Sequence, residues 1–174
     1  MVRAVFPGTF DPIHFGHINI TRRAAQLFKE VVVAVYDRPL KSLLFSPEER
    51  LALVRRAFAD DERIRVVGYN GLTVDFCQKI DAQVIVRGLR VFSDFEYEFR
   101  MALANNRLAP GIEVVALITS EEHTFLSSST VREIASLGGN LTSMVPPFVI
   151  EALNRRFHEL GETQTVVPQT SLRD

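Results

Sequence analysis

The sequence of 174 residues contains one cysteine and no tryptophan. The single cysteine, Cys77, excludes an intramolecular disulfide framework and a zinc site built from several cysteines, and it suits a reducing, cytoplasmic location. No apolar run reaches the roughly 18 residues that a membrane-spanning helix needs. The apolar N-terminus is short and is interrupted by Pro7 and Asp11, so we expect neither a signal peptide nor a membrane partner.

An excess of charge of one sign is also absent, because 20 Lys and Arg residues balance 21 Asp and Glu residues. The net charge of −1 excludes a broadly basic face, so we expect no nucleic acid partner. Hydrophobic residues make up 47% of the chain, which indicates a globular protein rather than a disordered one. We expect one domain over residues 1–160 and a loosely held C-terminal tail over residues 161–174.

Five short apolar runs rich in β-branched residues are spaced along the chain and predict buried strands, apolar on both faces. These runs are Val2–Phe6, Val31–Tyr36, Ile64–Val67, Val84–Val86 and Val114–Ile118. Segments with helical periodicity separate them, and two more helices follow the last run. The alternation predicts an α/β fold, a doubly wound five-stranded parallel sheet with C-terminal helices.

Two four-residue patterns predict where helices begin. Ser46-Pro47-Glu48-Glu49 and Ser93-Asp94-Phe95-Glu96 each match a capping box, in which the serine side chain caps the helix. Gly138-Gly139 is expected to end a fifth helix, and Pro146-Pro147 to begin a sixth that runs to about His158.

Polar and basic residues cluster in the segments that follow the predicted strands. Three of the four histidines fall there, together with two arginines, a lysine and a run of serines. Because the carboxyl ends of parallel strands share one edge of the sheet, these side chains should lie on one rim. Converging donors and positive charge suit a polyanionic ligand such as a phosphate ester.

The segment His14-x-Gly16-His17 stands at the expected start of the first helix. A helix N-terminus presents free N–H groups and favours an anion, and two imidazoles three residues apart can face the same side of the first turn. The alternative from spacing alone is a pair of exposed or capping histidines. A zinc site is disfavoured because no third ligand is evident.

The first loop resembles a known signature. Gly8-Thr9-Phe10-Asp11-Pro12 followed by His14-x-Gly16-His17 is similar to the signature of the HxGH nucleotidylyltransferase superfamily, which has a Rossmann-like fold. Within it, the chain most resembles the bacterial phosphopantetheine adenylyltransferase family. The further matches are Lys41 with Phe45, Glu48-Glu49-Arg50, Arg87-Gly88-Leu89-Arg90, Asp94-Phe95-Glu96-Tyr97-Glu98 and Ser127–Ser129. They span most of residues 1–157 in the expected order.

The resemblance implies a reaction in which ATP and 4′-phosphopantetheine give dephospho-coenzyme A and pyrophosphate, the penultimate step of coenzyme A synthesis. It implies Mg²⁺ as cofactor and no covalent enzyme intermediate. It further implies a homohexamer and feedback inhibition by coenzyme A. Since the attacking phosphate is already anionic, positioning and electrostatics would carry the catalysis.

The resemblance also assigns catalytic roles. His17 would donate to the α-phosphate of ATP as charge develops, and Arg90 would reach the ATP phosphates. Thr9 would bind the phosphate of phosphopantetheine and help to place it. Lys41 would bridge that phosphate and the α-phosphate.

The remaining residues of the resemblance divide between the two substrates. On the phosphopantetheine side they are Thr9, Lys41, Leu72, Thr73 and Arg87. On the ATP side they are Thr9, Phe10, His14, His17, Gly88, Leu89, Arg90, Glu98, His123, Thr124, Phe125, Leu126, Ser127, Ser128 and Ser129. Phe10 would act through its backbone N–H, and Glu98 through the ribose.

Two positions depart from the family pattern. His14 stands where most phosphopantetheine adenylyltransferases have threonine, and His123-Thr124 replaces an aromatic-Ser pair. Glu98 has a simpler alternative as a helix-surface carboxylate paired with a neighbour such as Arg100.

Two other functions remain open. Ser128-Ser129-Thr130-Val131-Arg132 partly resembles a motif of adenylyltransferases that use nicotinamide mononucleotide. A non-enzymatic nucleotide-binding regulator could share the fold, although intact His17, Lys41 and Arg90 disfavour it. The small size and the lack of a basic face exclude an aminoacyl-tRNA synthetase.

Overall fold

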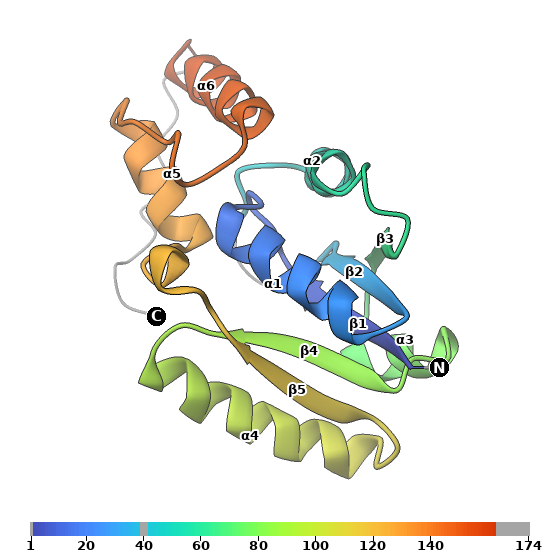
Figure 1. The fold of residues 1–174 in the computed structure, drawn as a ribbon. Helices are drawn as coiled ribbons and strands as arrows, with labels where there is room; N and C mark the ends of the chain where they lie inside the picture. Colours follow the sequence, from blue (N-terminus) through green and yellow to red (C-terminus); the bar gives the residue numbers. More distant parts are fainter. Residues whose placement is uncertain (1, 39–41, 163–174) are drawn as a thin grey trace.

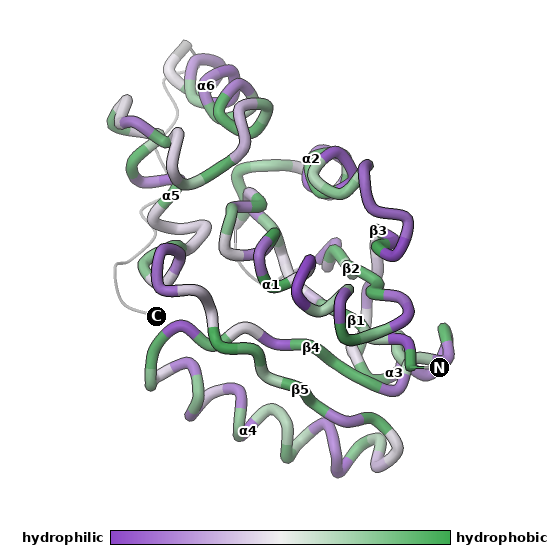
Figure 2. Tube along the Cα trace, viewed as in Figure 1, coloured by the Kyte–Doolittle hydropathy of each residue, from purple (hydrophilic) through white to green (hydrophobic). Residues whose placement is uncertain are grey.

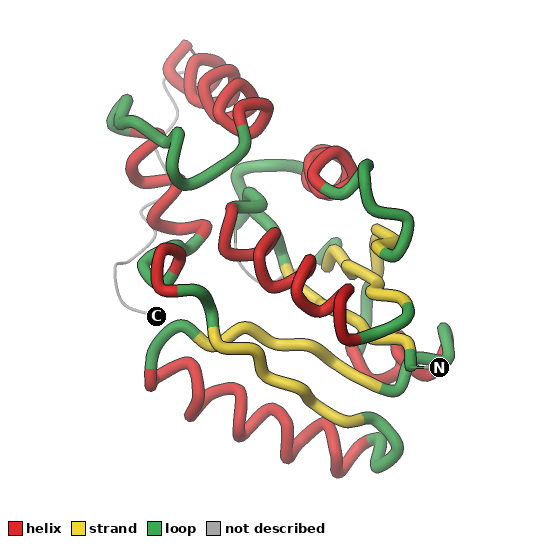
Figure 3. Tube along the Cα trace, viewed as in Figure 1, coloured by secondary structure: helices red, strands yellow, loops and turns green. Residues whose placement is uncertain are grey.

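A computed structural model describes residues 2–38 and 42–162, in which strands and helices alternate along the chain (Figures 1 and 3). The strands are β1 (Arg3–Gly8), β2 (Glu30–Tyr36), β3 (Ile64–Tyr69), β4 (Val84–Leu89) and β5 (Glu113–Ile118). The helices are α1 (Phe15–Leu27), α2 (Pro47–Ala57), α3 (Thr73–Lys79), α4 (Phe92–Leu108), α5 (Ser128–Ser136) and α6 (Pro147–Glu162), with a 3₁₀ turn, η1, over Glu121–His123. The predicted order of elements is confirmed.

The five strands form one parallel sheet in the order β3-β2-β1-β4-β5. The predicted doubly wound, Rossmann-like α/β fold is therefore confirmed. The chain leaves one edge after β3 and returns to the centre as β4, so the direction of winding reverses between β1 and β4. Such a reversal is where doubly wound sheets bind their ligands.

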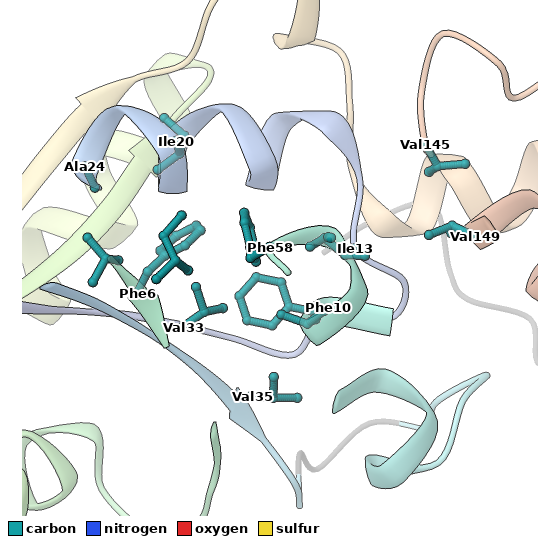
Figure 4. Close-up of a cluster of buried hydrophobic side chains, with 14 of the residues drawn as sticks. Phe6, Phe10, Ile13, Ile20, Ala24, Val33, Val35, Phe58, Val145 and Val149 are labelled. Atoms are coloured by element: carbon teal, nitrogen blue, oxygen red, sulfur yellow. The ribbon is translucent and has the colours of Figure 1, made fainter. Parts of the chain in front are cut away.

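Alternate residues of the central strands face two separate hydrophobic cores. In β2, Val31, Val33 and Val35 belong to the core shared with α1, α2, α5 and α6, whereas Val32 and Ala34 face the core shared with α3. Figure 4 shows part of the larger core, with aromatic and aliphatic side chains packed between α1 and the sheet. Both faces of the central strands are covered, which explains their continuous apolar runs.

Strands β1 and β4 separate soon after they start. Their register pairs Ala4 with Val84 and Val5 with Ile85, while β1 continues to Gly8 and β4 to Leu89. The carboxyl ends of the two central strands therefore diverge and open a space at the reversal point.

The α4–β5 side of the sheet differs from the prediction of buried elements. No residue of β5 is buried, since it is the edge strand, and no residue of α4 is buried either. Figure 2 shows hydrophobic residues recurring along α4, on the outer side of the sheet. Phe92, Phe95, Phe99 and Leu103 are all exposed and follow helical spacing. We call these four residues the outer stripe.

One of the two predicted capping boxes is confirmed and the other is wrong. Ser46 caps α2: its Oγ accepts a hydrogen bond from Glu49 N at 3.2 Å, and Glu49 Oε2 accepts one from Ser46 N at 2.8 Å. Ser93 instead lies inside α4, whose N-cap is Val91, and that helix end has no side-chain cap. Asp94, the second residue of the expected box, accepts from Arg90 N at 3.0 Å, which starts the helix earlier.

The C-terminal helices agree with the prediction to within a turn. Gly138 has φ 72° and ends α5, with Gly139 N donating to Ile134 O at 2.9 Å. Helix α6 extends to Glu162, beyond the expected end near His158, so the first two residues of the expected tail are helical. Residues 163–174 lie outside the described part, and the domain boundary stays a prediction. No helix in residues 2–38 and 42–162 is long and apolar enough to cross a membrane.

The two serines provide a matched test of the caps. Ser46→Ala should lower the free energy of unfolding by about 1 kcal/mol, because the backbone N–H of Glu49 in the first turn of α2 loses its side-chain acceptor. Ser93→Ala should leave it unchanged or slightly higher, because alanine is the better helix former at an uncapped position. Urea unfolding of both variants measures the difference, and equal losses would contradict the assignment.

Candidate active site

A cleft of about 920 Å³ lies at the carboxyl ends of the strands, where β1 and β4 diverge. The loops after β1 and β3, the end of β4, the inner face of α4 and the start of α5 form its walls. Fourteen of the predicted site residues line it: Thr9, Phe10, His14, His17, Leu72, Thr73, Arg87, Gly88, Arg90, Glu98, Leu126, Ser127, Ser128 and Ser129. The expectation that the loops after the strands converge on one rim is therefore confirmed for these residues.

The two histidines of the first loop cap helix α1 reciprocally. His14 is the N-cap residue, and its Nδ1 accepts from His17 N at 3.4 Å. His17 Nδ1 accepts from His14 N at 3.3 Å. The rings stack with centroids 3.6 Å apart, so they face the same side as the spacing predicts. The capping alternative and the ligand-binding reading are compatible, since each ring uses only one nitrogen in the cap.

The caps also determine which nitrogen carries the proton. Burial lowers the pKa of His17 to about 3, with nearby Arg90 and Arg87 acting in the same direction. Burial and the neighbouring His17 likewise lower the pKa of His14 well below its usual range. Both rings are therefore neutral near pH 7, and because Nδ1 accepts in each, the proton lies on Nε2. His17 presents a neutral N–H donor to the cleft.

The loop between β1 and α1 is shaped by close packing of its own residues. Phe10 has φ 52°, and its buried ring packs edge-on to His17 with centroids 4.9 Å apart. A Cβ on Gly8 would come within 2.8 Å of that ring. Residue 8 therefore has to be glycine. The Phe10 side chain is buried in the core, so only the backbone of Phe10 is left to contact a ligand.

Asp11 lines the cleft, although the sequence analysis quoted it in a motif without assigning it to the site. Its buried carboxylate accepts from Leu44 N at 2.9 Å and from Phe45 N at 3.0 Å. Arg132 on α5 donates to both its backbone carbonyl and Oδ2. Asp11 thus joins the first loop to the segment before α2 and to α5.

Arg50 is a second positioning residue that was missed. It is completely buried, and its guanidinium donates to Thr9 O and Tyr36 O, both at 2.7 Å, and to Asp37 O at 3.4 Å. The sequence does contain a signal, because Arg50 shares the helical spacing of the buried residues Val54 and Ala57. A buried arginine needs hydrogen-bond partners, so this position could have indicated a structural role. It ties the carbonyl side of Thr9 to the end of β2.

The arginine near the end of β4 and the arginine just after it are each paired with a carboxylate of α4. Arg87 Nε and Nη2 donate to Glu98 at 2.8 and 2.6 Å. Arg90 Nε and Nη2 donate to Asp94 at 3.1 and 3.3 Å, and Arg90 Nη1 donates to Leu126 O at 2.7 Å. Glu98 is therefore neither an isolated surface carboxylate nor a partner of Arg100, which pairs with Glu96 instead.

The opposite wall of the cleft is more apolar. Tyr69 OH and Thr73 Oγ1 are 3.0 Å apart, and the Tyr69 ring packs against Tyr36 with centroids 5.2 Å apart. Leu72 precedes α3 and is half exposed beside them. This side suits an elongated organic group rather than a second phosphate.

The start of α5 contributes hydroxyls and backbone N–H groups. Ser127 is its N-cap, accepting from Thr130 N at 3.0 Å, and Ser128 Oγ donates to Pro12 O at 2.9 Å. Arg132 Nη2 donates to Ser129 Oγ at 3.3 Å. The first turn of a nine-residue helix facing the cleft is a favourable place for phosphate oxygens.

Five predicted residues are not among those that line the cleft. Four of them are Leu89, His123, Thr124 and Phe125, and the His123 ring stacks on Phe15 with centroids 6.3 Å apart. Lys41 lies outside the described residues. The roles of these five stay predictions, as do the roles of the fourteen that line the cleft.

Metal ligands are scarce in this site. Within the described chain, no three His, Cys, Asp or Glu side chains gather into a group that could hold a metal ion. The carboxylates of Asp11, Asp94 and Glu98 each bond to an arginine. The residues present therefore do not form a protein cage for Mg²⁺, whose usual partners in nucleotide sites include the phosphates themselves.

Comparison with known proteins agrees with the geometry. A family model described as cytidylyltransferase-like matches residues 5–134. A phosphopantetheine adenylyltransferase from Roseiflexus sp. (strain RS-1) is 51% identical over 157 residues, covering 90% of this chain and 98% of the relative. The chain belongs to the phosphopantetheine adenylyltransferase family. A family member from Dictyoglomus turgidum is 46% identical over 157 residues, covering 90% and 98%.

A solved structure gives independent support for the fold. A Vibrio parahaemolyticus protein described as a nicotinate-nucleotide adenylyltransferase superposes with a TM-score of 0.67 at 19% identity, covering 91% of this chain and 96% of that one. At that identity the likeness shows the shared fold alone. This chain and the more distant protein therefore share one fold.

The lowered pKa of His17 has a measurable consequence for stability. Native His17 resists protonation down to about pH 3, whereas an unfolded imidazole takes up a proton near pH 6.5. The unfolded chain therefore gains protons first as the pH falls below about 6.5, and stability is lost over that range. His17→Asn should lose less stability between pH 7 and pH 5 than the unchanged protein does, as measured by urea unfolding. An equal loss in both proteins would contradict a buried, neutral His17.

Proposed function

We propose that this chain transfers AMP from ATP to 4′-phosphopantetheine, giving dephospho-coenzyme A and pyrophosphate. A phosphate oxygen of phosphopantetheine attacks the α-phosphorus of ATP, a new P–O bond forms, and the bond to the β-phosphate breaks. The observation that carries the proposal is that His17, Arg87 and Arg90 line one cleft, with His17 Nδ1 occupied by the helix cap so that Nε2 is left for a ligand. The relatives at 46–51% identity support phosphopantetheine over nicotinamide mononucleotide as the acceptor.

The cleft supplies donors where charge would develop. A neutral imidazole with its proton on Nε2 is already a hydrogen-bond donor. Its bond to the α-phosphate can strengthen as negative charge develops there in the transition state. Neither substrate has to be deprotonated by a strong base, since both bring phosphate oxygens that are already anionic. The enzyme's task is therefore to align two polyanions, and its fixed N–H groups suit that task.

The two walls of the cleft suit the two substrates. We assign the phosphates of ATP to the first turns of α1 and α5, next to His14 and Ser129. The pantetheine arm takes the wall formed by Tyr69, Leu72 and Thr73. Mg²⁺ would enter on the phosphates of ATP, and we propose a cytoplasmic enzyme of coenzyme A synthesis with coenzyme A as its feedback inhibitor.

Pyrophosphate release tests the substrate assignment directly. With Mg²⁺ and ATP, the protein should release pyrophosphate in the presence of 4′-phosphopantetheine and not in the presence of nicotinamide mononucleotide. Release with nicotinamide mononucleotide alone would overturn the acceptor assignment. No release with either acceptor would favour a nucleotide-binding regulator.

The variant His17→Ala tests the role of His17 in the same assay. It should lower kcat by about 10²–10³-fold, because a donor to the developing charge is removed. ATP affinity, measured by calorimetry, should change little. Turnover near that of the unchanged protein would overturn the assigned role of His17.

We also propose that the chain assembles with copies of itself into a homohexamer, as its resemblance to phosphopantetheine adenylyltransferases implies. The outer stripe supports an assembly, since four large apolar side chains on one helix face are left uncovered in the single chain. Phe92 is 85% exposed, and Ile118 on the adjoining edge strand is 75% exposed. A second copy of the chain is the occupant that we propose for this face.

Light scattering on a sizing column measures the assembly. The unchanged protein should have six times the mass of the 19.6 kDa chain. Phe99→Glu should shift the mass to smaller species, because a charge would be buried unpaired in the contact. Leu27→Glu, an exposed apolar position at the end of α1, is the control and should not change the mass. A hexamer that persists in Phe99→Glu would place the contact elsewhere.

A further inference from the structure

We propose that Arg50 is a positioning residue that keeps the peptide between Thr9 and Phe10 turned so that the Phe10 N–H faces the phosphates of ATP. The inference rests on the proposed function, because it names the substrate that this N–H serves. Its basis is the hydrogen bonding of the buried guanidinium together with the backbone conformation of Phe10.

Arg50 reaches the loop between β1 and α1 from helix α2. Its side chain is completely buried, and Nη1 donates to Thr9 O and to Tyr36 O, both at 2.7 Å. Nη2 donates to Asp37 O at 3.4 Å. Tyr36 ends β2 and Asp37 follows it, so the guanidinium ties the Thr9 carbonyl to a central strand of the sheet. The carbonyl of Thr9 is therefore held on the α2 side.

The placement of Arg50 is costly for stability. Within the described residues it forms no ion pair, whereas Arg87, Arg90 and Arg132 each bond to a carboxylate. Its buried Nε has no hydrogen-bond partner there either. A buried charge with an unmade hydrogen bond destabilises a fold, and an apolar side chain of similar volume is often at least as stable. A role in the site therefore explains Arg50 better than a role in stability does.

Phe10 has a backbone conformation that a peptide flip would relieve. Its φ of 52° lies in the left-handed region, where a bulky side chain is strained. A flip of the Thr9–Phe10 peptide turns this φ by about 180°, into the extended region that any residue adopts. The flip leaves both Cα atoms in place, so the Phe10 ring can stay in the core, where Figure 4 shows it. The bond from Arg50 to Thr9 O opposes the flip.

The flip would change what the loop offers to a ligand, because the carbonyl and the N–H of one trans peptide point in opposite directions. With Thr9 O held by Arg50, the Phe10 N–H points away from α2, and it donates to no backbone carbonyl in the described chain. Thr9 and Phe10 line the cleft, whereas Arg50 does not. The N–H is thus left for an anion, and a cation bonded to the carbonyl polarises the peptide and strengthens this donor.

Calorimetric binding of each substrate alone tests the inference. Arg50→Met should weaken ATP binding about tenfold, because the released peptide no longer aims its N–H at a phosphate. Phosphopantetheine binding should change less than about twofold, since a peptide flip leaves the Thr9 side chain in place. Arg55→Met is the matched control, because Arg55 is exposed on the same helix, and it should change neither affinity. Unchanged ATP binding, or equal weakening of both substrates, would overturn the inference.

A backbone change that leaves Arg50 intact provides a second test, which also applies if Arg50→Met does not fold. Phenyllactic acid in place of Phe10 makes the link to Thr9 an ester, which keeps the ring and the carbonyl but has no N–H. The ester should weaken ATP binding by a factor similar to that of Arg50→Met, and combining the two changes should have little further effect. Unchanged ATP binding in the ester protein would overturn the inference, as would effects that multiply. Urea unfolding shows whether each variant is folded.

Failure of the proposed function has a different outcome. It would appear in the unchanged protein, which would not release pyrophosphate from ATP in the presence of phosphopantetheine. Failure of the inference on Arg50 alone would appear only in the variants, with the unchanged protein active.

Discussion

The buried carboxylate of Asp11 holds the loop between β1 and α1 in place. It accepts two backbone N–H groups of the segment before α2, and Arg132 bonds to the same residue from α5. Three chain segments far apart in sequence therefore meet on one residue that is 1% exposed. Breaking such a buried pair by removing one partner costs about 3–5 kcal/mol. The positions of Thr9 and His14, on either side of Asp11, depend on it.

Much of the fold could be predicted because its signals are local. The β-branched runs lie in the strands that the structure contains, and the carboxyl ends of parallel strands share one edge wherever the helices lie. The stacking of His14 and His17 follows from a three-residue spacing on one helical turn. For the same reason, the Ser46 capping box was predictable from four adjacent residues.

The partners of the site residues could not be predicted, because they come from distant parts of the chain. Arg50 bonds to the carbonyl of Thr9, 41 residues away, and Arg132 bonds to Asp11, 121 residues away. Sequence spacing carries no signal for such pairs. The same limit explains the error at Ser93: a capping box is a local pattern, and the bond from Arg90 N to Asp94 competes with it.

The charge of the cleft is smaller than its basic residues suggest. Arg87, Arg90 and Arg132 are each paired with a carboxylate, and His14 and His17 are neutral near pH 7. A phosphate entering the cleft therefore meets directed N–H groups of fixed orientation more than a diffuse positive field. A hydrogen bond from a fixed N–H group is strong only when the phosphate oxygen lies in line with it. Such donors therefore favour an aligned arrangement of two phosphates over loose anion binding. The chain's near-neutral total charge and its ability to bring two polyanions together are compatible for this reason.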